Sequence, residues 1–146
     1  MAHPEPAPGA FPVSIKGVVV RDGRVLLVEN ERKEWELPGG RIEIGETPQQ
    51  CVAREIVEET RWSVTTGPLL DAWMYHVHPG RHVFVVAYGC YPHVAGSVDP
   101  VLSDEHSTIG LFAEHEVSEL VMPGDYKRVI ATWFERLRRA APEMVG

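Results

Sequence analysis

Residues 40–62 read GRIEIGETPQQCVAREIVEETRW, a stretch in which a glycine-containing loop leads into a strongly charged helical pattern. Thr47 and Gln50 are spaced as a capping box, and Pro48 takes the first helical position, where its missing N–H costs nothing. The pattern predicts a helix that begins at Thr47 and ends near Thr60. The glycines before it let the backbone approach a ligand closely.

Three carboxylates gather on one side of this predicted helix. At about 100° per residue, Glu55, Glu58 and Glu59 fall within an arc of about 100°. Like charges at these spacings cost roughly 0.2–0.5 kcal/mol per pair, and the helix macrodipole opposes negative charge near the C-terminus. A plain solvated acidic face would leave this cost in place, whereas a divalent cation would reverse it. The residues expected on the opposite, buried side are Val52, Ala53, Ile56, Val57 and Thr60.

The spacing of the charged residues resembles the Nudix box, which is Gly, five residues, Glu, seven residues, then Arg-Glu-apolar-any-Glu-Glu-any-Gly-apolar. Six of its seven fixed positions are present, and both apolar positions are occupied by Ile56 and Trp62. Such a match arises by chance on the order of once in ten million starting positions. One position departs, because Arg61 stands where the family has glycine, which puts the geometry of the helix exit in doubt. The six matching residues are Gly40, Glu46, Arg54, Glu55, Glu58 and Glu59.

The resemblance implies a fold and a reaction. The fold would be an α+β fold of the Nudix type, an α/β/α sandwich around a mixed β-sheet. The enzyme would use Mg²⁺, with Mn²⁺ as a substitute, to direct a water molecule at phosphorus in a diphosphate linkage. The substrate would be a nucleoside diphosphate linked to another moiety: a nucleoside triphosphate, ADP-ribose or a nucleotide sugar.

The resemblance also implies roles for individual residues. Glu55 would be a further metal ligand or the general base, and Arg54 would hold a carboxylate in place. Glu46 and Gly39 would order the loop before the helix. The implied catalytic residues are Glu55, Arg54, Glu58 and Glu59. The implied metal ligands are Glu55, Glu58, Glu59 and the Gly40 backbone, with Glu105 as a further candidate.

Residues outside the box must recognise the group attached to the diphosphate, and the sequence indicates these residues less clearly than those of the box. Trp73 and Tyr75 are candidates to stack on a base, although large aromatic residues more often belong to a core. Arg81, at the end of a Pro-Gly turn segment, is a further candidate to bind the substrate. These three residues are the predicted substrate-binding set.

The remaining elements follow from alternation, turn residues and helical spacing. Residues 38–40 are expected to be irregular because they read Pro-Gly-Gly, and residues 92–108 to form a long mobile loop. The predicted strands are 14–20, 25–29, 69–76, 82–91 and 109–112. The predicted helices after the first are 114–120 and 125–139.

Composition bounds the class of protein. With 146 residues we expect one domain, 13–146, after a flexible Pro/Ala-rich tail, 1–12. A net charge of −7 argues against a dedicated nucleic-acid binder. The two cysteines are far apart and do not predict a zinc site or a disulfide framework. With neither a signal peptide nor an apolar stretch of membrane-spanning length, the sequence predicts a soluble cytoplasmic protein without membrane contact.

Two other classes of function compete with the hydrolase. One is a nucleotide-binding or regulatory module that keeps the fold without the activity, and Arg61 is the feature that favours it. The other is an isomerase-type relative acting on an isoprenoid diphosphate, whose cysteine and histidine constellation is not evident here. Homodimerisation is common among similar proteins and is a further expectation.

Overall fold

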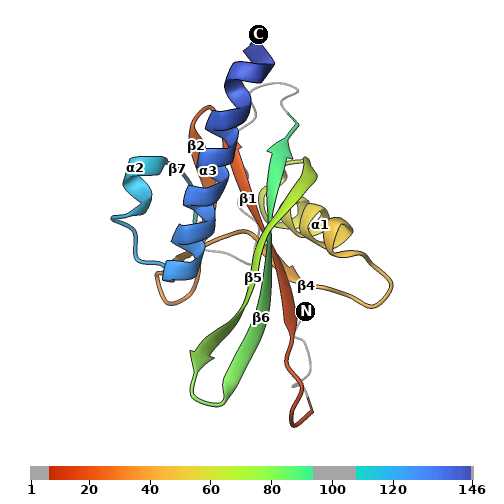
Figure 1. Ribbon diagram of the computed structural model, residues 1–146. Coiled ribbons are helices and arrows are strands. Elements are labelled where there is room, and N and C mark those ends of the chain that lie inside the picture. The colour runs from red at the N-terminus through yellow and green to blue at the C-terminus, as the bar shows by residue number, and fades with distance from the viewer. Residues whose placement is uncertain (1–6, 94–107, 146) are drawn as a thin grey trace.

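The helix that carries the charged pattern is present as α1 (Pro48–Thr60). The computed structural model describes residues 7–93 and 108–145 (Figure 1). The side chain of Thr47 accepts a hydrogen bond from the Gln50 N–H at 3.1 Å, and Gln50 Oε1 accepts one from the Thr47 N–H at 2.9 Å. The predicted capping box is therefore confirmed, and Pro48 lies at the start of the helix as expected.

The strands form one mixed sheet with the order β3-β2-β1-β6-β5, in which β4 also pairs with β1 and β7 with β2. The β1–β6 pair is parallel and the other pairs are antiparallel. The strands are β1 (Val13–Arg21), β2 (Arg24–Glu29), β3 (Trp35–Glu36), β4 (Gly39–Arg41), β5 (Val64–His78), β6 (Arg81–Pro92) and β7 (Thr108–Ala113). The remaining helices are α2 (Glu114–Val117) and α3 (Gly124–Val145).

Two hydrophobic clusters lie on opposite faces of the sheet. On one face Ile130 and Trp133 of α3 pack with Val18, and on the other Ile56 of α1 packs with Val19. Adjacent residues of β1 thus enter different clusters, because side chains alternate across a strand. Covering on both faces explains why this strand is almost continuously apolar. The arrangement of α1 and α3 about the sheet (Figure 1) confirms the predicted α/β/α sandwich.

Several predicted boundaries were wrong. Residues 39–41 form strand β4 rather than irregular backbone, because Gly39 and Gly40 pair with β1 where other residues would not fit. Strand β5 begins at Val64 instead of Leu69, and bulges near Leu69 hide its alternation. The helix predicted over 114–120 ends at Val117, and the last helix extends from 124 to 145. Most of the predicted loop at 92–108, with Glu105, lies outside the described residues.

Among the described helices, none combines the length and the apolar character that crossing a lipid bilayer requires.

Arg61 ends α1 in the left-handed conformation that the family's glycine would favour. Its φ and ψ are 67° and 7°, and its N–H donates to the Val57 carbonyl at 2.9 Å. The helix exit is therefore kept, at the strain that a Cβ causes in this region, about 1 kcal/mol. An ion pair between Arg61 and Glu58 is not present in the described structure, where Arg54 is the cation that contacts Glu58.

We expect Arg61→Gly to raise the free energy of unfolding by about 1 kcal/mol, because glycine adopts this φ without strain. The melting temperature should rise by roughly 2–4 °C in a chain of this size. Thermal and urea unfolding measure both quantities. Arg136→Gly within α3 is the matched control and should destabilise by about 1 kcal/mol. A loss of stability in Arg61→Gly would contradict the strain at this position.

Candidate active site

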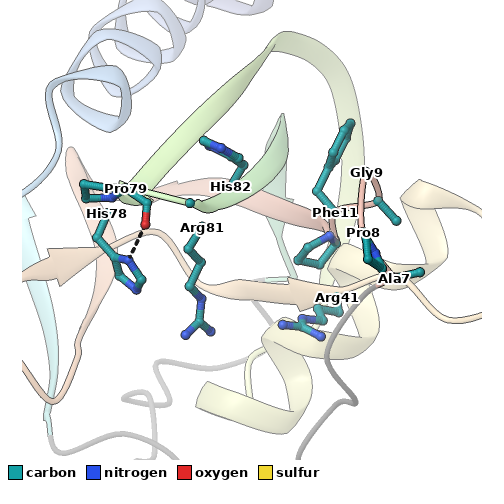
Figure 2. A pocket seen from close by; sticks show the side chains of 12 residues that line it. Ala7, Pro8, Gly9, Phe11, Arg41, His78, Pro79, Arg81 and His82 are labelled. Atoms are coloured by element: carbon teal, nitrogen blue, oxygen red, sulfur yellow. Dashed lines mark hydrogen bonds between the residues drawn. The ribbon is translucent and has the colours of Figure 1, made fainter.

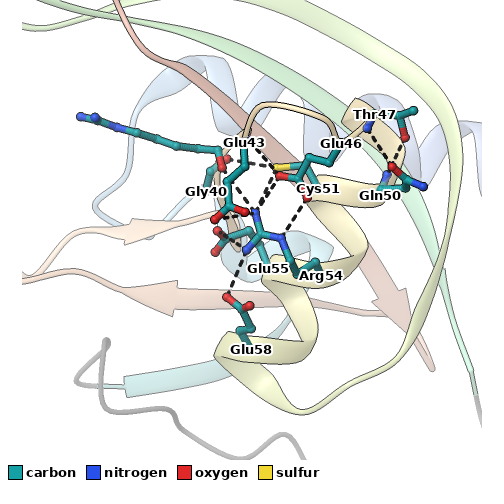
Figure 3. Close-up of polar contacts among 10 residues, drawn as sticks. Gly40, Glu43, Glu46, Thr47, Gln50, Cys51, Arg54, Glu55 and Glu58 are labelled. Carbon is teal, nitrogen blue, oxygen red and sulfur yellow. Dashed lines mark hydrogen bonds and ion pairs between the residues drawn. The ribbon is translucent and has the colours of Figure 1, made fainter. Parts of the chain in front are cut away.

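Arg54 connects the glutamates of α1 to the loop before the helix (Figure 3). Its guanidinium donates to both carboxylate oxygens of Glu46, at 2.8 and 3.0 Å. Its Nη1 donates to Glu55 Oε1 at 3.0 Å and to Glu58 Oε2 at 3.2 Å. Arg54 therefore supplies part of the positive charge that offsets the repulsion among the glutamates of α1. A metal is not the only cation that can reduce this repulsion.

Glu46 is held by contacts from both sides. Besides the two bonds from Arg54, it accepts a hydrogen bond from the Glu43 N–H at 2.9 Å, which closes the loop over residues 43–46. The hydrogen bonds from Arg54, aided by the Glu43 N–H, lower the pKa of Glu46 from 4.5 to about 2, although burial opposes the shift. Glu46 thus keeps its charge, and its bond to Arg54, in moderately acidic solution.

Glu46→Gln should make the protein less stable, and the loss should depend on pH. A carboxyl whose pKa is depressed in the folded state stabilises the fold fully above its unfolded pKa of 4.5. That contribution disappears as the pH falls towards about 2. The difference in urea midpoint between wild type and Glu46→Gln should therefore be constant above about pH 5 and shrink below it. A difference that does not change between pH 6 and pH 3 would contradict the low pKa of Glu46.

Glu59 is buried against the glycine loop, contrary to its expected place on an exposed acidic face. The residue is 1% exposed, and its Oε1 accepts a hydrogen bond from the Gly39 N–H at 2.8 Å. Val57, expected on the buried side, is 40% exposed instead. The buried side of the helix therefore includes Glu59, because Gly39 provides its carboxylate with a backbone donor inside the protein. Val57 belongs to neither of the two hydrophobic clusters.

Gly39 cannot be replaced by a larger residue without moving β1. Its φ is +145°, and a Cβ there would lie 2.1 Å from the Ile15 carbonyl oxygen. Close contact with β1 places the Gly39 N–H where it binds Glu59. The glycine is therefore required by the backbone that positions the Glu59 carboxylate.

Glu55 lies directly on the backbone of Gly40. A Cβ on Gly40 would lie 2.5 Å from the carboxylate carbon of Glu55, so only glycine leaves room for this group. The Gly40 carbonyl, the proposed backbone ligand, accepts a weak hydrogen bond from the Cys51 thiol at 3.7 Å. Burial raises the pKa of Cys51 to about 12, so the thiol stays protonated and can donate. The consecutive glycines Gly39 and Gly40 are thus in contact with Glu59 and Glu55 of α1, respectively.

Lys16 is a charged residue of this region that the sequence analysis missed. It lies on β1 opposite Gly39 and is only 9% exposed. Burial alone would lower the pKa of Lys16, but the surrounding acidic groups together raise it above its ordinary value. These groups are Tyr126, Glu36, Glu59 and Glu55. A single charged residue within the mainly apolar predicted strand 14–20 was the signal that could have identified it.

The carboxylates of this site suit a cation whose coordination shell is completed by a substrate, rather than one enclosed by protein ligands. In residues 7–93 and 108–145, no three His, Cys, Asp or Glu side chains converge on a ready-made metal site. Glu55 and Glu59, however, present hard carboxylate oxygens at adjacent glycines. Mg²⁺ is commonly held by one or two carboxylates, with water and substrate phosphates completing its shell. Glu58 lies further out, with a half-exposed side chain.

The structure separates the three predicted substrate-binding residues. Tyr75 and Arg81 line a cavity of about 460 Å³ that Lys16 also lines. Trp73 does not line it, and instead packs edge-on against Tyr126 at 5.9 Å between ring centroids. Arg81 also lines a second cavity, of about 550 Å³, between the β5–β6 turn and residues 7–12 (Figure 2). Tyr75 and Arg81 thus share one cavity, while Trp73 is partly buried and packs against the hydrophobic cluster beneath α3.

Similarity to known proteins indicates the same family as the residues of the site. Residues 11–134 match the NUDIX domain family. A MutT-like protein of Streptomyces ambofaciens is 37% identical over 123 residues, which are 82% of this chain and 76% of the relative. An 8-oxo-dGTP diphosphatase of Proteus vulgaris is 47% identical over 49 residues, 34% of this chain and 43% of the relative.

A solved structure extends the likeness to the fold. The crystal structure of a MutT NUDIX hydrolase from Burkholderia pseudomallei has a TM-score of 0.68 to this chain at 26% identity, covering 84% of this chain and 97% of that one. The chain belongs to the Nudix hydrolase family, since the family match covers most of its length and the MutT-like relative aligns across the same region. Members of this family generally use a divalent metal and act on nucleotide-type diphosphates.

Proposed function

We propose that this Nudix hydrolase uses Mg²⁺ to cleave the diphosphate linkage of a nucleoside diphosphate joined to another moiety. The observation that supports this most is the placement of Glu55 and Glu59 against Gly40 and Gly39. Arg54 fixes the orientation of Glu55 and ties it to the loop through Glu46. Two carboxylates beside the part-buried glycines of β4 form the protein half of a Mg²⁺–diphosphate site.

Each residue has a defined part in the proposed reaction. A Mg²⁺ ion held by Glu58 and Glu59 would neutralise charge on the diphosphate and lower the pKa of the attacking water. Glu55 accepts the proton of that water, whose oxygen forms a bond to one phosphorus. The bond from this phosphorus to the bridging oxygen breaks, and the electron pair leaves with the second phosphate. Arg54 keeps the carboxylate of Glu55 directed at the reacting atoms through a charge-assisted hydrogen bond.

The metal ligands in this proposal are Glu59 and Glu58, with Glu55 as a further ligand when it is not the base. The Gly40 carbonyl and Glu105 are additional candidates, the first beside Glu55 and the second outside the described residues. Arg54 contacts only Oε2 of Glu58, at 3.2 Å, so Oε1 of the same carboxylate can bind the metal while this hydrogen bond is kept.

The proposed substrate class includes nucleoside triphosphates, ADP-ribose and nucleotide sugars. The Proteus vulgaris relative is an 8-oxo-dGTP diphosphatase, which supports a nucleotide substrate. The left-handed exit at Arg61 keeps the end of α1 in order, so the feature that favoured an inactive binding module is accommodated by the fold.

The test is a substrate panel. Purified protein is incubated with nucleoside triphosphates, ADP-ribose and nucleotide sugars in the presence of Mg²⁺, Mn²⁺ or EDTA. The products are separated and identified by mass spectrometry. We expect one class of substrate to be cleaved within its diphosphate, with no turnover in EDTA. Tight nucleotide binding without cleavage in either metal would instead identify a binding module.

A further inference from the structure

Lys16 lies where the backbone that supports the catalytic carboxylates meets an open cavity. In the β1–β4 pairing it is the partner of Gly39, whose N–H binds Glu59. It interacts electrostatically with Glu59 and Glu55, and it is almost fully buried. Burying an ammonium group is costly unless it has charged partners. The chain therefore keeps a positive charge beside the proposed metal site.

The cavity next to Lys16 has the size and lining of a nucleotide site. Its volume of about 460 Å³ falls within the range common for small-molecule sites. Tyr75 provides an aromatic ring, Glu36 and Asn30 provide polar groups, and Arg81 provides a second positive charge. Aromatic faces bind any base by stacking, while an acceptor such as Glu36 can bind an amino group.

A purely structural role explains Lys16 less well. A lysine that only neutralised Glu59 and Glu36 could be enclosed by protein, but Lys16 lines an open cavity. An ammonium group has three donors and no acceptor, which suits the oxygens of a phosphate. Because Lys16 both lines the cavity and interacts with Glu55 and Glu59, a phosphate bound to it would adjoin a nucleoside held in the cavity.

We propose that Lys16 binds a phosphate of the substrate, and that the cavity it lines takes the nucleoside-type group joined to that phosphate. This role of Lys16 rests on the proposed hydrolysis of a nucleoside diphosphate derivative, and it names the residue that binds the negatively charged phosphate. Tyr75 stacks on the base in this arrangement, and Arg81 supplies a second positive charge in the lining of the same cavity.

Equilibrium binding without metal tests the proposal separately from catalysis. Dissociation constants for ADP and for adenosine are measured in EDTA by isothermal titration calorimetry. The proteins are wild type, Lys16→Met, Lys16→Arg and the exposed-loop control Lys33→Met. We expect Lys16→Met to weaken ADP about tenfold or more and to leave adenosine unchanged, because adenosine has no phosphate. Lys16→Arg should recover part of the loss, and Lys33→Met should match wild type.

The outcomes separate the possible roles. Equal weakening of ADP and adenosine in Lys16→Met would mean that the lysine only shapes the cavity, and would overturn the proposal. Unchanged ADP binding in a Lys16→Met protein with a lowered melting temperature would assign it a structural role only. Failure of wild type to bind ADP would also overturn it. An ADP-specific loss in a protein that cleaves nothing on the substrate panel would uphold Lys16 and reject the hydrolase proposal.

Discussion

Replacing Glu55 by Gln is expected to lower kcat by roughly 10²–10⁴-fold, the contribution typical of a positioned general base. Gln has nearly the same shape and can still accept a hydrogen bond from Arg54, so the fold should survive. What disappears is the negative charge that accepts a proton or binds a metal where the carboxylate rests on Gly40. Steady-state kinetics with the cleaved substrate and a melting curve measure the two effects.

The control for this variant is Glu119→Gln, which alters an exposed glutamate after α2. It should leave kcat and the melting temperature at the wild-type values. If Glu55→Gln keeps kcat within about threefold of wild type, then Glu55 is neither the base nor a required ligand.

Arg54→Met should have the next largest effect, because one guanidinium contacts Glu46, Glu55 and Glu58. Without it the three carboxylates repel one another and Glu55 loses its orientation. We expect kcat to fall about 10–100-fold, as for partners that orient metal ligands. Stability should fall by about 1–3 kcal/mol, because partly buried carboxylates lose a charged hydrogen bond.

Two further arginine variants make the result specific. Arg54→Lys keeps the charge but not the planar fork, so its kcat should lie between those of Arg54→Met and wild type. Arg138→Met removes an exposed arginine that also contacts two carboxylates, Glu114 and Glu135. Such a surface pair is worth at most about 1 kcal/mol, and kcat should not change. Equal losses of activity in Arg54→Met and Arg138→Met would show that the positioning role is absent.

Local rules were enough to predict much of the framework. The capping residues placed the start of α1 to within one residue, since caps act over three or four positions. The succession of predicted strands, with one helix at 47–60 and another at 125–139, indicated helices packed about a mixed sheet. The bounds of β5 were not predictable, because its bulges break the alternation of side chains from which strands are recognised.

The candidate site was predictable in its list of residues but not in its arrangement. A helical wheel groups Glu55, Glu58 and Glu59 together, yet one is buried, one rests on a glycine and one is half-exposed. This division arises from β4, a strand that pairs with a distant part of the chain and that no local pattern indicated. Lys16 was missed for the same reason, since the acidic groups around it come from three separate elements, α1, β3 and α3.

In the proposed reaction, the carboxylates of α1 beside Gly39 and Gly40 bind the divalent metal needed for cleavage of the diphosphate. Mn²⁺ binding followed by electron paramagnetic resonance tests it without substrate, comparing wild type with Glu59→Gln and with the Glu119→Gln control. We predict saturable binding that Glu59→Gln weakens about tenfold or more while the control does not. Equal Mn²⁺ affinity in all three proteins would contradict the claim and place the metal elsewhere in the chain.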